Sequence, residues 1–277
     1  MKYVPIINPG MKIKIIWDSI IFFVILFLFF MFPLELSFNY QENVNSSIFD
    51  GLSILQRNFE IVFSIFIGMD ILLKFTTGFY RNGKLITNRK EIIKNYAKKG
   101  LIYDSIFFLQ LILSTNLQYS SSLNGQKDLQ GLIRVLRICI FFKIPEIIRF
   151  FHVLEEIFQL TNVGIAIFQL TKLTSSIFLF SHFMGCGWHA ISYYVSSQNN
   201  MLKAINIYDA AWQTRYFRCL FITVNPGKVD PKNDSELIFG FFALLATSGS
   251  IGFMISGIHN IMRTLSKSNE SKRYIVF

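Results

Sequence analysis

The chain has 277 residues, of which 52% are hydrophobic and only 16% are charged. An ordinary soluble domain carries about 25% charged residues, so this composition excludes a typical soluble protein and indicates a membrane protein. The net charge of +10 comes without a nucleic-acid-binding motif, so it predicts attraction to anionic lipid rather than to nucleic acid. The sequence contains no Ser/His/Asp constellation and no phosphate-binding loop, and we therefore expect neither enzymatic activity nor a cofactor.

Six apolar stretches predict six transmembrane helices, because about 20 helical residues cross a bilayer. In chain order they cover residues 13–36, 56–79, 101–115, 131–150, 168–195 and 236–262. The third stretch is short and the fourth is charged. Basic residues concentrate at both termini and in the loop between spans two and three, whereas the loop after span one is mainly acidic. Short basic loops resist translocation, so we predict a multi-pass integral membrane protein with both termini in the cytoplasm.

The fourth stretch carries cations on a three-residue lattice, which is the pattern of a voltage sensor. The cations are Arg134, Arg137, Lys143 and Arg149, while Ile140 and Glu146 occupy the steps between them. A charge at the bilayer centre costs several kcal/mol, so such cations persist only where they are paired or hydrated. Pro145 lacks an N–H and is predicted to bend or end the helix. The alternative interpretation is an amphipathic surface helix with solvated cations.

Spans two and three each contain an acid, Asp70 and Asp104, and both are predicted counter-charges for the cations of span four. A cation that moves from one acid to the other crosses the membrane field without ever being unpaired. Each 100 mV supplies about 2.3 kcal/mol per charge moved, so the few cations here would bias an equilibrium rather than make it steep. The alternative is that both acids are static partners, and the sequence does not distinguish the two.

Several motifs stand at defined places along the predicted spans. They are Asn8-Pro9-Gly10, Asp70-Ile71-Leu72-Leu73-Lys74-Phe75-Thr76-Thr77-Gly78, Arg89-Lys90 through Asn95-Tyr96, Phe151-His152 through Leu154-Glu155-Glu156-Ile157-Phe158, and Ser181-His182-Phe183-Met184-Gly185-Cys186-Gly187-Trp188. Together they resemble the six-span cation channels related to cyclic-nucleotide-gated, hyperpolarisation-activated and ether-à-go-go potassium channels, in the style of the ciliate members. One departure concerns sensing, because the aromatic residue that this family places three residues before the span-two acid is Ile67 here.

The resemblance implies an all-α membrane protein with two domains. A four-helix voltage-sensor-like bundle is expected at 1–150, a linker at 151–165, a two-helix pore domain at 166–265 with a re-entrant loop at 212–231, and a cytoplasmic tail at 266–277. It also implies a homo- or hetero-tetramer in the plasma or ciliary membrane that conducts potassium or another monovalent cation. The nucleotide-binding domain of the family is not encoded in these residues.

The segment between spans five and six is too short to cross the bilayer, and non-helical backbone at membrane depth indicates a re-entrant pore. Potassium filters use a Thr-Val-Gly-Tyr-Gly loop whose carbonyl oxygens replace the water around the ion. The matching filter position holds Thr223, Val224, Asn225, Pro226 and Gly227. Pro226 fixes its own φ and restricts the residue before it. Lys228 stands where the family has an acid, and the pore helix is about six residues shorter, or about 9 Å at helical rise.

Three explanations of this degenerate filter remain open: a non-conducting modulatory subunit that co-assembles with intact channels, a different selectivity, or a gene model that lost a short segment. In span six, Gly249 is a candidate gate hinge, with close helix packing as the alternative. His182, Cys186 and His189 share one helical face, yet the sequence offers no fourth ligand, so we predict no metal site.

Overall fold

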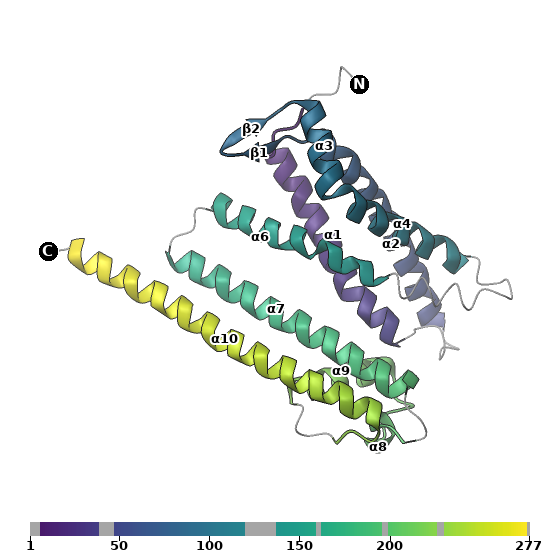
Figure 1. Cartoon of the computed structure of the whole chain (residues 1–277). Coiled ribbons are helices and arrows are strands. Elements are labelled where there is room, and N and C mark those ends of the chain that lie inside the picture. Colours follow the sequence, from purple (N-terminus) through teal and green to yellow (C-terminus); the bar gives the residue numbers. More distant parts are fainter. Residues whose placement is uncertain are drawn as a thin grey trace. The chain divides into compact units, whose positions relative to one another are not determined.

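The computed structural model describes residues 6–38, 47–119, 137–158, 162–195, 199–225 and 230–275. These residues are mostly helical (Figure 1). The chain divides into two compact units. Unit 1 comprises Met1–Phe29 with Val44–Val153, and unit 2 comprises Phe30–Asn43 with Leu154–Phe277. Helix α1 (Lys12–Phe38) therefore contributes its first part to unit 1 and its last turns to unit 2.

Three of the described helices are long and apolar enough to cross a membrane. They are α1, the stretch Gly164–Tyr194 that begins in α7 (Asn162–Ala190), and the stretch Asp234–Arg263 of α10 (Asp234–Ile275). These helices overlap the first, fifth and sixth predicted spans. Helix α4 (Leu101–Tyr119) contains a shorter apolar stretch, Leu101–Ser114. Membrane crossing by the second, third and fourth stretches stays a prediction.

Unit 1 contains a small β-hairpin that the all-α prediction omitted. Helix α2 (Ser47–Lys74) leads into β1 (Phe79–Arg81) and β2 (Lys84–Ile86), which pair antiparallel. The turn between them is Asn82-Gly83, with φ of 51° and 74°. Asn-Gly is favoured there because a two-residue hairpin turn needs positive φ at both central residues. This dipeptide was the signal that sequence reasoning missed.

After the hairpin, helix α3 (Arg89–Lys99) leads into α4. Asn88 begins α3 by accepting a hydrogen bond from the backbone N–H of Lys90 at 3.1 Å. Lys98 and Lys99 lie in the last turn of α3, where positive charge complements the carboxyl end of a helix. A capping asparagine thus stabilises the start of α3, and two lysines stabilise its end.

The fourth predicted span has two kinds of helix. Its described part begins with the 3₁₀ helix η1 (Arg137–Lys143) and continues as α6 (Ile144–Phe158). The change occurs next to Pro145, which lies in the first turn of α6, where a missing N–H costs no intrahelical hydrogen bond. Helix α6 continues past residue 150, where the prediction placed the start of a linker. Residues 131–136 of the predicted span lie outside the described residues.

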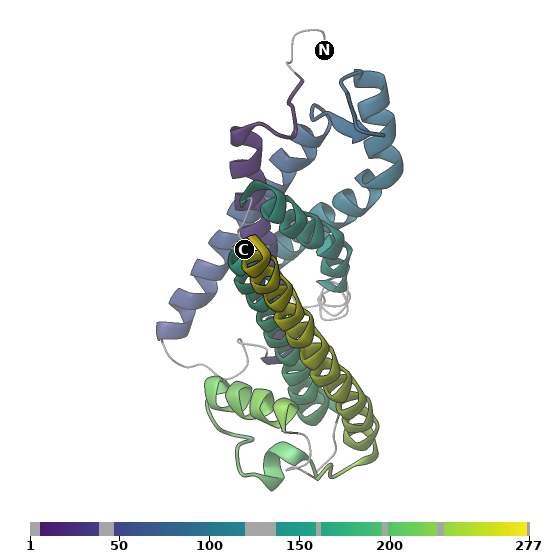
Figure 2. The same ribbon diagram turned by 90° about the vertical axis from the view of Figure 1, so that its left-hand side faces the viewer.

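Unit 2 is organised around α7, which packs against both α10 and the short helix α9 (Trp212–Val224). Figures 1 and 2 both show α7 and α10 running side by side. A Cβ placed on Gly257 would lie 2.8 Å from a Leu173 side-chain atom, so the missing side chain permits this close approach. A Cβ on Gly249 or on Gly252 would meet no atom within 4 Å. Close packing within the chain therefore explains Gly257, and a hinge at Gly249 stays a prediction.

The span-five motif holds α9 in place. His182 Nε2 donates to the Phe30 carbonyl oxygen at 2.8 Å, because a carbonyl can only accept, and its Nδ1 pairs with the Tyr216 hydroxyl at 3.0 Å. Trp188 Nε1 donates to Met201 Sδ at 2.8 Å, and Met201 is the first residue of the short helix α8 (Met201–Ala204) in the segment that leads to α9. These motif residues thus work as packing anchors for the segment between α7 and α10.

Gly185 in the same motif is expected to tolerate no side chain. An added Cβ would lie 3.2 Å from Leu220 Cα and 3.3 Å from its backbone nitrogen, and backbone atoms of α9 cannot move aside as a flexible side chain can. Gly185→Ala is expected to destabilise the protein by about 1–3 kcal/mol, which a thermal unfolding scan in detergent would detect. Gly252→Ala is the matched control, and equal melting temperatures for the two variants would contradict the packing described here.

Candidate functional site

The 3₁₀ helix η1 turns the three-residue lattice into one buried row. A 3₁₀ helix has three residues per turn, so residues i and i+3 lie directly above one another. Arg137, Ile140 and Lys143 occupy this row, and they are only 5%, 2% and 2% exposed. The residues between them face outward, as Ile138 and Phe142 do at 55% and 47% exposure. The basic residues of the row are thus held away from solvent.

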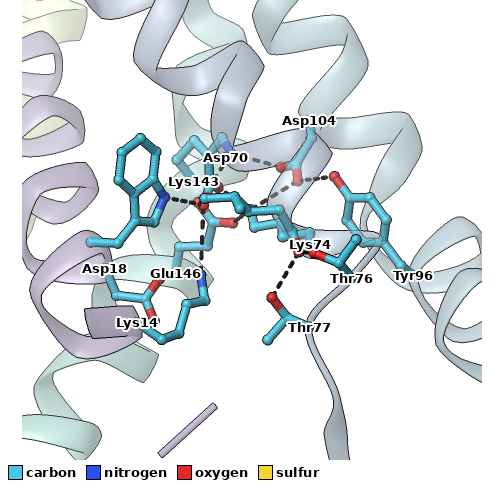
Figure 3. A network of polar contacts seen from close by, with 12 residues as sticks. Lys14, Asp18, Asp70, Lys74, Thr76, Thr77, Tyr96, Asp104, Lys143 and Glu146 are labelled. Carbon is cyan, nitrogen blue, oxygen red and sulfur yellow. Dashed lines mark hydrogen bonds and ion pairs between the residues drawn. The ribbon is translucent and has the colours of Figure 1, made fainter. Parts of the chain in front are cut away.

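Lys143 lies in a cluster of ion pairs (Figure 3). Its Nζ atom donates to Asp104 Oδ1 at 2.6 Å and to Glu146 Oε2 at 3.0 Å. Lys74 Nζ lies 2.9 Å from both Asp70 Oδ2 and Asp104 Oδ2, and it also binds Glu146. Both predicted counter-charges therefore belong to one cluster around two lysines.

Helices α1 and α3 complete this cluster. Lys14 Nζ lies 2.5 Å from Asp18 and 3.9 Å from Asp70, while Trp17 Nε1 donates to Asp70 Oδ1 at 3.2 Å. Tyr96 on α3 donates its hydroxyl hydrogen to Asp104 Oδ2 at 2.7 Å. Burial, followed by the hydrogen bond to Asp104, raises the pKa of Tyr96 well above its ordinary value. The phenol therefore remains a donor at physiological pH.

We call these ionised groups the lysine–carboxylate cluster. Its members are Lys14, Lys74, Lys143, Asp18, Asp70, Asp104 and Glu146. Three lysines face four carboxylates, so the formal charge of the ionised cluster is −1 with Lys143 in place and −2 without it. This excess of negative charge favours a cation at the Lys143 position.

Arg137, at the opposite end of η1 from Lys143, binds a second group of polar residues. Its Nη2 atom donates to Ser114 Oγ at 2.7 Å and lies 3.8 Å from Glu60 Oε1, and Ser114 Oγ in turn donates to Glu60 at 3.4 Å. Glu60 is only 3% exposed. Sequence reasoning did not single out Glu60, although a charged residue inside the predicted span 56–79 was itself a signal.

Four buried apolar residues stand between the two polar positions, and the buried side chain of Gln110 lies between two of them in the sequence of α4. We call these four residues the apolar layer: Ile67 on α2, Phe107 and Leu111 on α4, and Ile140 on η1. None is more than 2% exposed. On α2, Ile67 lies between Glu60 and Asp70 in the sequence. These two acids are ten residues apart, about 15 Å at helical rise. Arg137 and Lys143 are six residues apart, about 12 Å along a 3₁₀ helix.

Phe107 supplies an aromatic ring next to the lysine–carboxylate cluster. Lys143 Nζ lies 5.5 Å from the centroid of this ring, within the range of a cation–π contact. The span-two position at which the resemblance leads one to expect an aromatic residue is Ile67. An aromatic side chain is thus present near the expected place, but it comes from α4 rather than from α2.

Of the two other basic residues that the sequence analysis singled out in the fourth stretch, the structure describes only Arg149. Arg149 is exposed on α6 and forms no ion pair within the described part of the chain. It leaves the row because the three-residue period ends with η1, and α6 returns to 3.6 residues per turn. Arg134 lies outside the described residues.

The predicted filter position begins inside a helix. Thr223 and Val224 form the last turn of α9, where the prediction expected non-helical backbone. The Thr223 carbonyl accepts a hydrogen bond from Thr247 Oγ1 at 3.4 Å. The helix ends at Asn225, whose φ of −126° and ψ of 64° are non-helical, because a residue before proline is driven out of the α region. Pro226 and Gly227 lie outside the described residues.

These features define a class of protein: a helical integral membrane protein in which buried cations are paired with acids on neighbouring helices. The family model described as ion transport protein matches residues 14–273. The chain therefore belongs to the ion transport protein family, and this membership identifies it as an ion channel subunit. No curated protein sequence is significantly similar to the chain.

Proposed function

We propose that this chain is a voltage-responsive subunit of a cation channel. The observation that supports this proposal is the buried row of η1, in which Arg137 and Lys143 bind acids at two positions separated by the apolar layer. A dry layer between two polar regions concentrates the membrane potential over a short distance. A cation that moves from one position to the other would therefore cross much of the field.

The energy available to such a sensor is modest but sufficient. Two cations that cross the whole field gain about 5 kcal/mol at 100 mV. A two-state equilibrium needs about 5.5 kcal/mol to move from 1:99 to 99:1. Physiological voltages would thus move most of the population between two states, with a shallow dependence on voltage.

Lys74 lowers the cost of moving Lys143. When Lys143 leaves its position, Asp70, Asp104 and Glu146 all keep Lys74 as a partner. An uncompensated buried charge costs several kcal/mol, and a resident lysine avoids that cost at each carboxylate. Lys74 thus makes the cluster a place that a mobile cation can enter and leave.

Arg137→Gln is expected to reduce the charge that moves when the voltage changes. Arg137 is one of the two cations in the row, so the displaced charge per subunit should fall by roughly half. Displacement currents recorded under voltage clamp from cells expressing the chain would measure it. Arg81→Gln is the matched control, because Arg81 is exposed on the hairpin and pairs with Glu91 at 3.4 Å. A displaced charge that is unchanged by Arg137→Gln would contradict voltage sensing by this row.

For the pore, we propose a homo- or hetero-tetramer that conducts potassium or another monovalent cation in the plasma or ciliary membrane, with both termini cytoplasmic. Support comes from the span-five motif and from α9, a short helix buried against α7 and α10. The test is potassium efflux and sodium efflux from liposomes that contain the purified protein. Efflux of either ion supports conduction, and their ratio gives the selectivity.

A second candidate function is a non-conducting subunit that modifies intact channels. It is favoured by the helical backbone of Thr223 and Val224, whose amides and carbonyls follow the helix instead of lining a filter. This candidate predicts no efflux from the protein alone and altered currents when it is expressed with a conducting relative. Co-assembly that leaves the currents of the relative unchanged would contradict it.

A further inference from the structure

Unit 2 contains a buried arginine that has no acid partner among the described residues. Arg215 lies in the first turn of α9 and is only 4% exposed. It forms no ion pair within the described ranges, and its Nε atom has no hydrogen-bond partner there. The guanidinium group faces the ring of Tyr193, whose centroid lies 5.0 Å from Cζ. A buried charge without a counter-charge is strongly unfavourable, so this position favours an anion.

His189 and Ser192 present two more buried polar atoms in the same part of unit 2. His189 lies at the end of α7, and Ser192 lies in the π-helical turn η2 (Ile191–Val195) that follows it. The imidazole ring stacks on Tyr193 with the ring centroids 5.4 Å apart, so it lies against the same ring as Arg215. Neither His189 Nε2 nor Ser192 Oγ has a hydrogen-bond partner in the described part of the chain. Buried polar groups nearly always have partners, so these three atoms together indicate a bound ion or an ordered water molecule.

The donors and acceptors of these three groups define the chemistry of the ligand. His189 Nδ1 lies 2.9 Å from the carbonyl oxygen of Ser37. A carbonyl oxygen only accepts, so Nδ1 carries the proton of the neutral ring and Nε2 presents a lone pair. Arg215 Nε and Ser192 Oγ each have a hydrogen to donate. The site therefore offers one positive charge, two hydrogen-bond donors and one acceptor. A halide ion matches the charge and the donors but cannot donate to Nε2.

We propose that Arg215, Ser192 and His189 bind a small oxyanion that carries a proton, such as hydrogencarbonate. Its oxygen atoms accept hydrogen bonds from Arg215 and Ser192, and such bonds are strong because both the anion and the guanidinium group are charged. Its hydroxyl group donates to His189 Nε2. A water molecule would match the donors and the acceptor but would leave the charge of Arg215 unbalanced. The proposal concerns unit 2 alone and stands whether or not the row of η1 senses voltage and the pore conducts.

Thermal unfolding of the purified full-length chain in detergent would test the proposal, with sodium hydrogencarbonate as the probe at constant ionic strength. A ligand that binds only the folded protein raises the melting temperature as its concentration increases. We expect such a rise for the wild-type protein and its loss in Arg215→Gln. Arg218→Gln is the matched control, because it removes the same charge from an exposed position of α9, and it should keep the rise. Equal responses of the two variants to hydrogencarbonate would overturn the proposal.

A second salt and a second variant separate the possible ligands. Sodium nitrate supplies an anion of the same planar shape and charge without a hydroxyl group, and it is expected to bind roughly five-fold more weakly because it cannot donate to His189. Equal affinity for nitrate would overturn the assignment of a ligand that carries a proton. A melting temperature that does not respond to either salt would identify water as the partner and overturn the anion site.

Ser192→Ala keeps the charge of Arg215 and removes one donor, so it tests the site even if Arg215→Gln does not fold. It is expected to weaken hydrogencarbonate binding roughly five-fold, because a hydrogen bond to a charged group is lost. An unchanged affinity in Ser192→Ala would contradict the proposed ligand position.

Discussion

Asp104→Asn is expected to lower the free energy of unfolding by about 3–5 kcal/mol, because it breaks a buried ion pair on one side only. Asp104 binds Lys74, Lys143 and Tyr96 at 2.9, 2.6 and 2.7 Å. Without this carboxylate, the 2% exposed Lys143 keeps Glu146 as its partner, and Glu146 must also serve Lys74. A thermal unfolding scan of the protein in detergent should show a midpoint roughly 6–20 °C lower.

Asp18→Asn is the matched control for this substitution. Asp18 belongs to the same cluster and pairs with Lys14, but its side chain is 41% exposed, and exposed pairs contribute about 0–1 kcal/mol. The double variant Asp104→Asn with Lys143→Gln should recover part of the loss, because the stranded cation is removed too. A double variant as unstable as the sum of its single variants would contradict direct coupling between the two residues.

Phe107→Ala is expected to open a leak for protons or small cations through unit 1. Phe107 is fully buried in the apolar layer, which separates Arg137 and Glu60 from the lysine–carboxylate cluster. A phenyl group removed from such a position leaves space for water, and the layer then no longer blocks an ion path. Purified protein in liposomes with an internal pH-sensitive dye would show faster proton entry under an imposed membrane potential.

Phe108→Ala is the control for Phe107→Ala. Phe108 follows Phe107 in the sequence, but its ring lies against Gly68 and is not part of the apolar layer. Because truncating a buried phenylalanine costs about 3–5 kcal/mol, both variants must first be shown to unfold cooperatively. Phe107→Leu, which keeps the layer apolar, should leak little. A folded Phe107→Ala protein with proton entry at the wild-type rate would contradict the proposed seal.

The sequence predicted the row of η1 better than its surroundings. The spacing of Arg137 and Lys143 is a multiple of three residues. In a 3₁₀ helix, which has three residues per turn, this spacing places both side chains on one face. The acids were harder to assign. Asp70 and Asp104 were expected at two levels of the membrane, but both bind Lys74, since α2 and α4 bring their charged ends together. Depth along a bundle depends on helix direction and register, which the sequence does not contain.

Glu60 was overlooked for a different reason. A single counter-charge, Asp70, was expected from the second span, although Glu60 stands ten residues before it in the same apolar stretch. The filter position also differed from expectation. Thr223 and Val224 were aligned by resemblance to a loop, while the local sequence has no glycine before Pro226 to end the helix earlier.

The anchoring of α9 has a consequence for biosynthesis. His182 binds the carbonyl of Phe30, and these residues are 152 positions apart in the chain. At a synthesis rate of about 5–20 residues per second, the last turns of α1 wait roughly 8–30 seconds for α7 to be made. All residues of unit 1 have been synthesised before that moment, because unit 1 ends at Val153. Unit 2 cannot form its contact between α1 and α7 until α7 has also been synthesised. The ribosome therefore sets the order in which the two units assemble, and a chain stalled before residue 182 leaves the end of α1 without its partner.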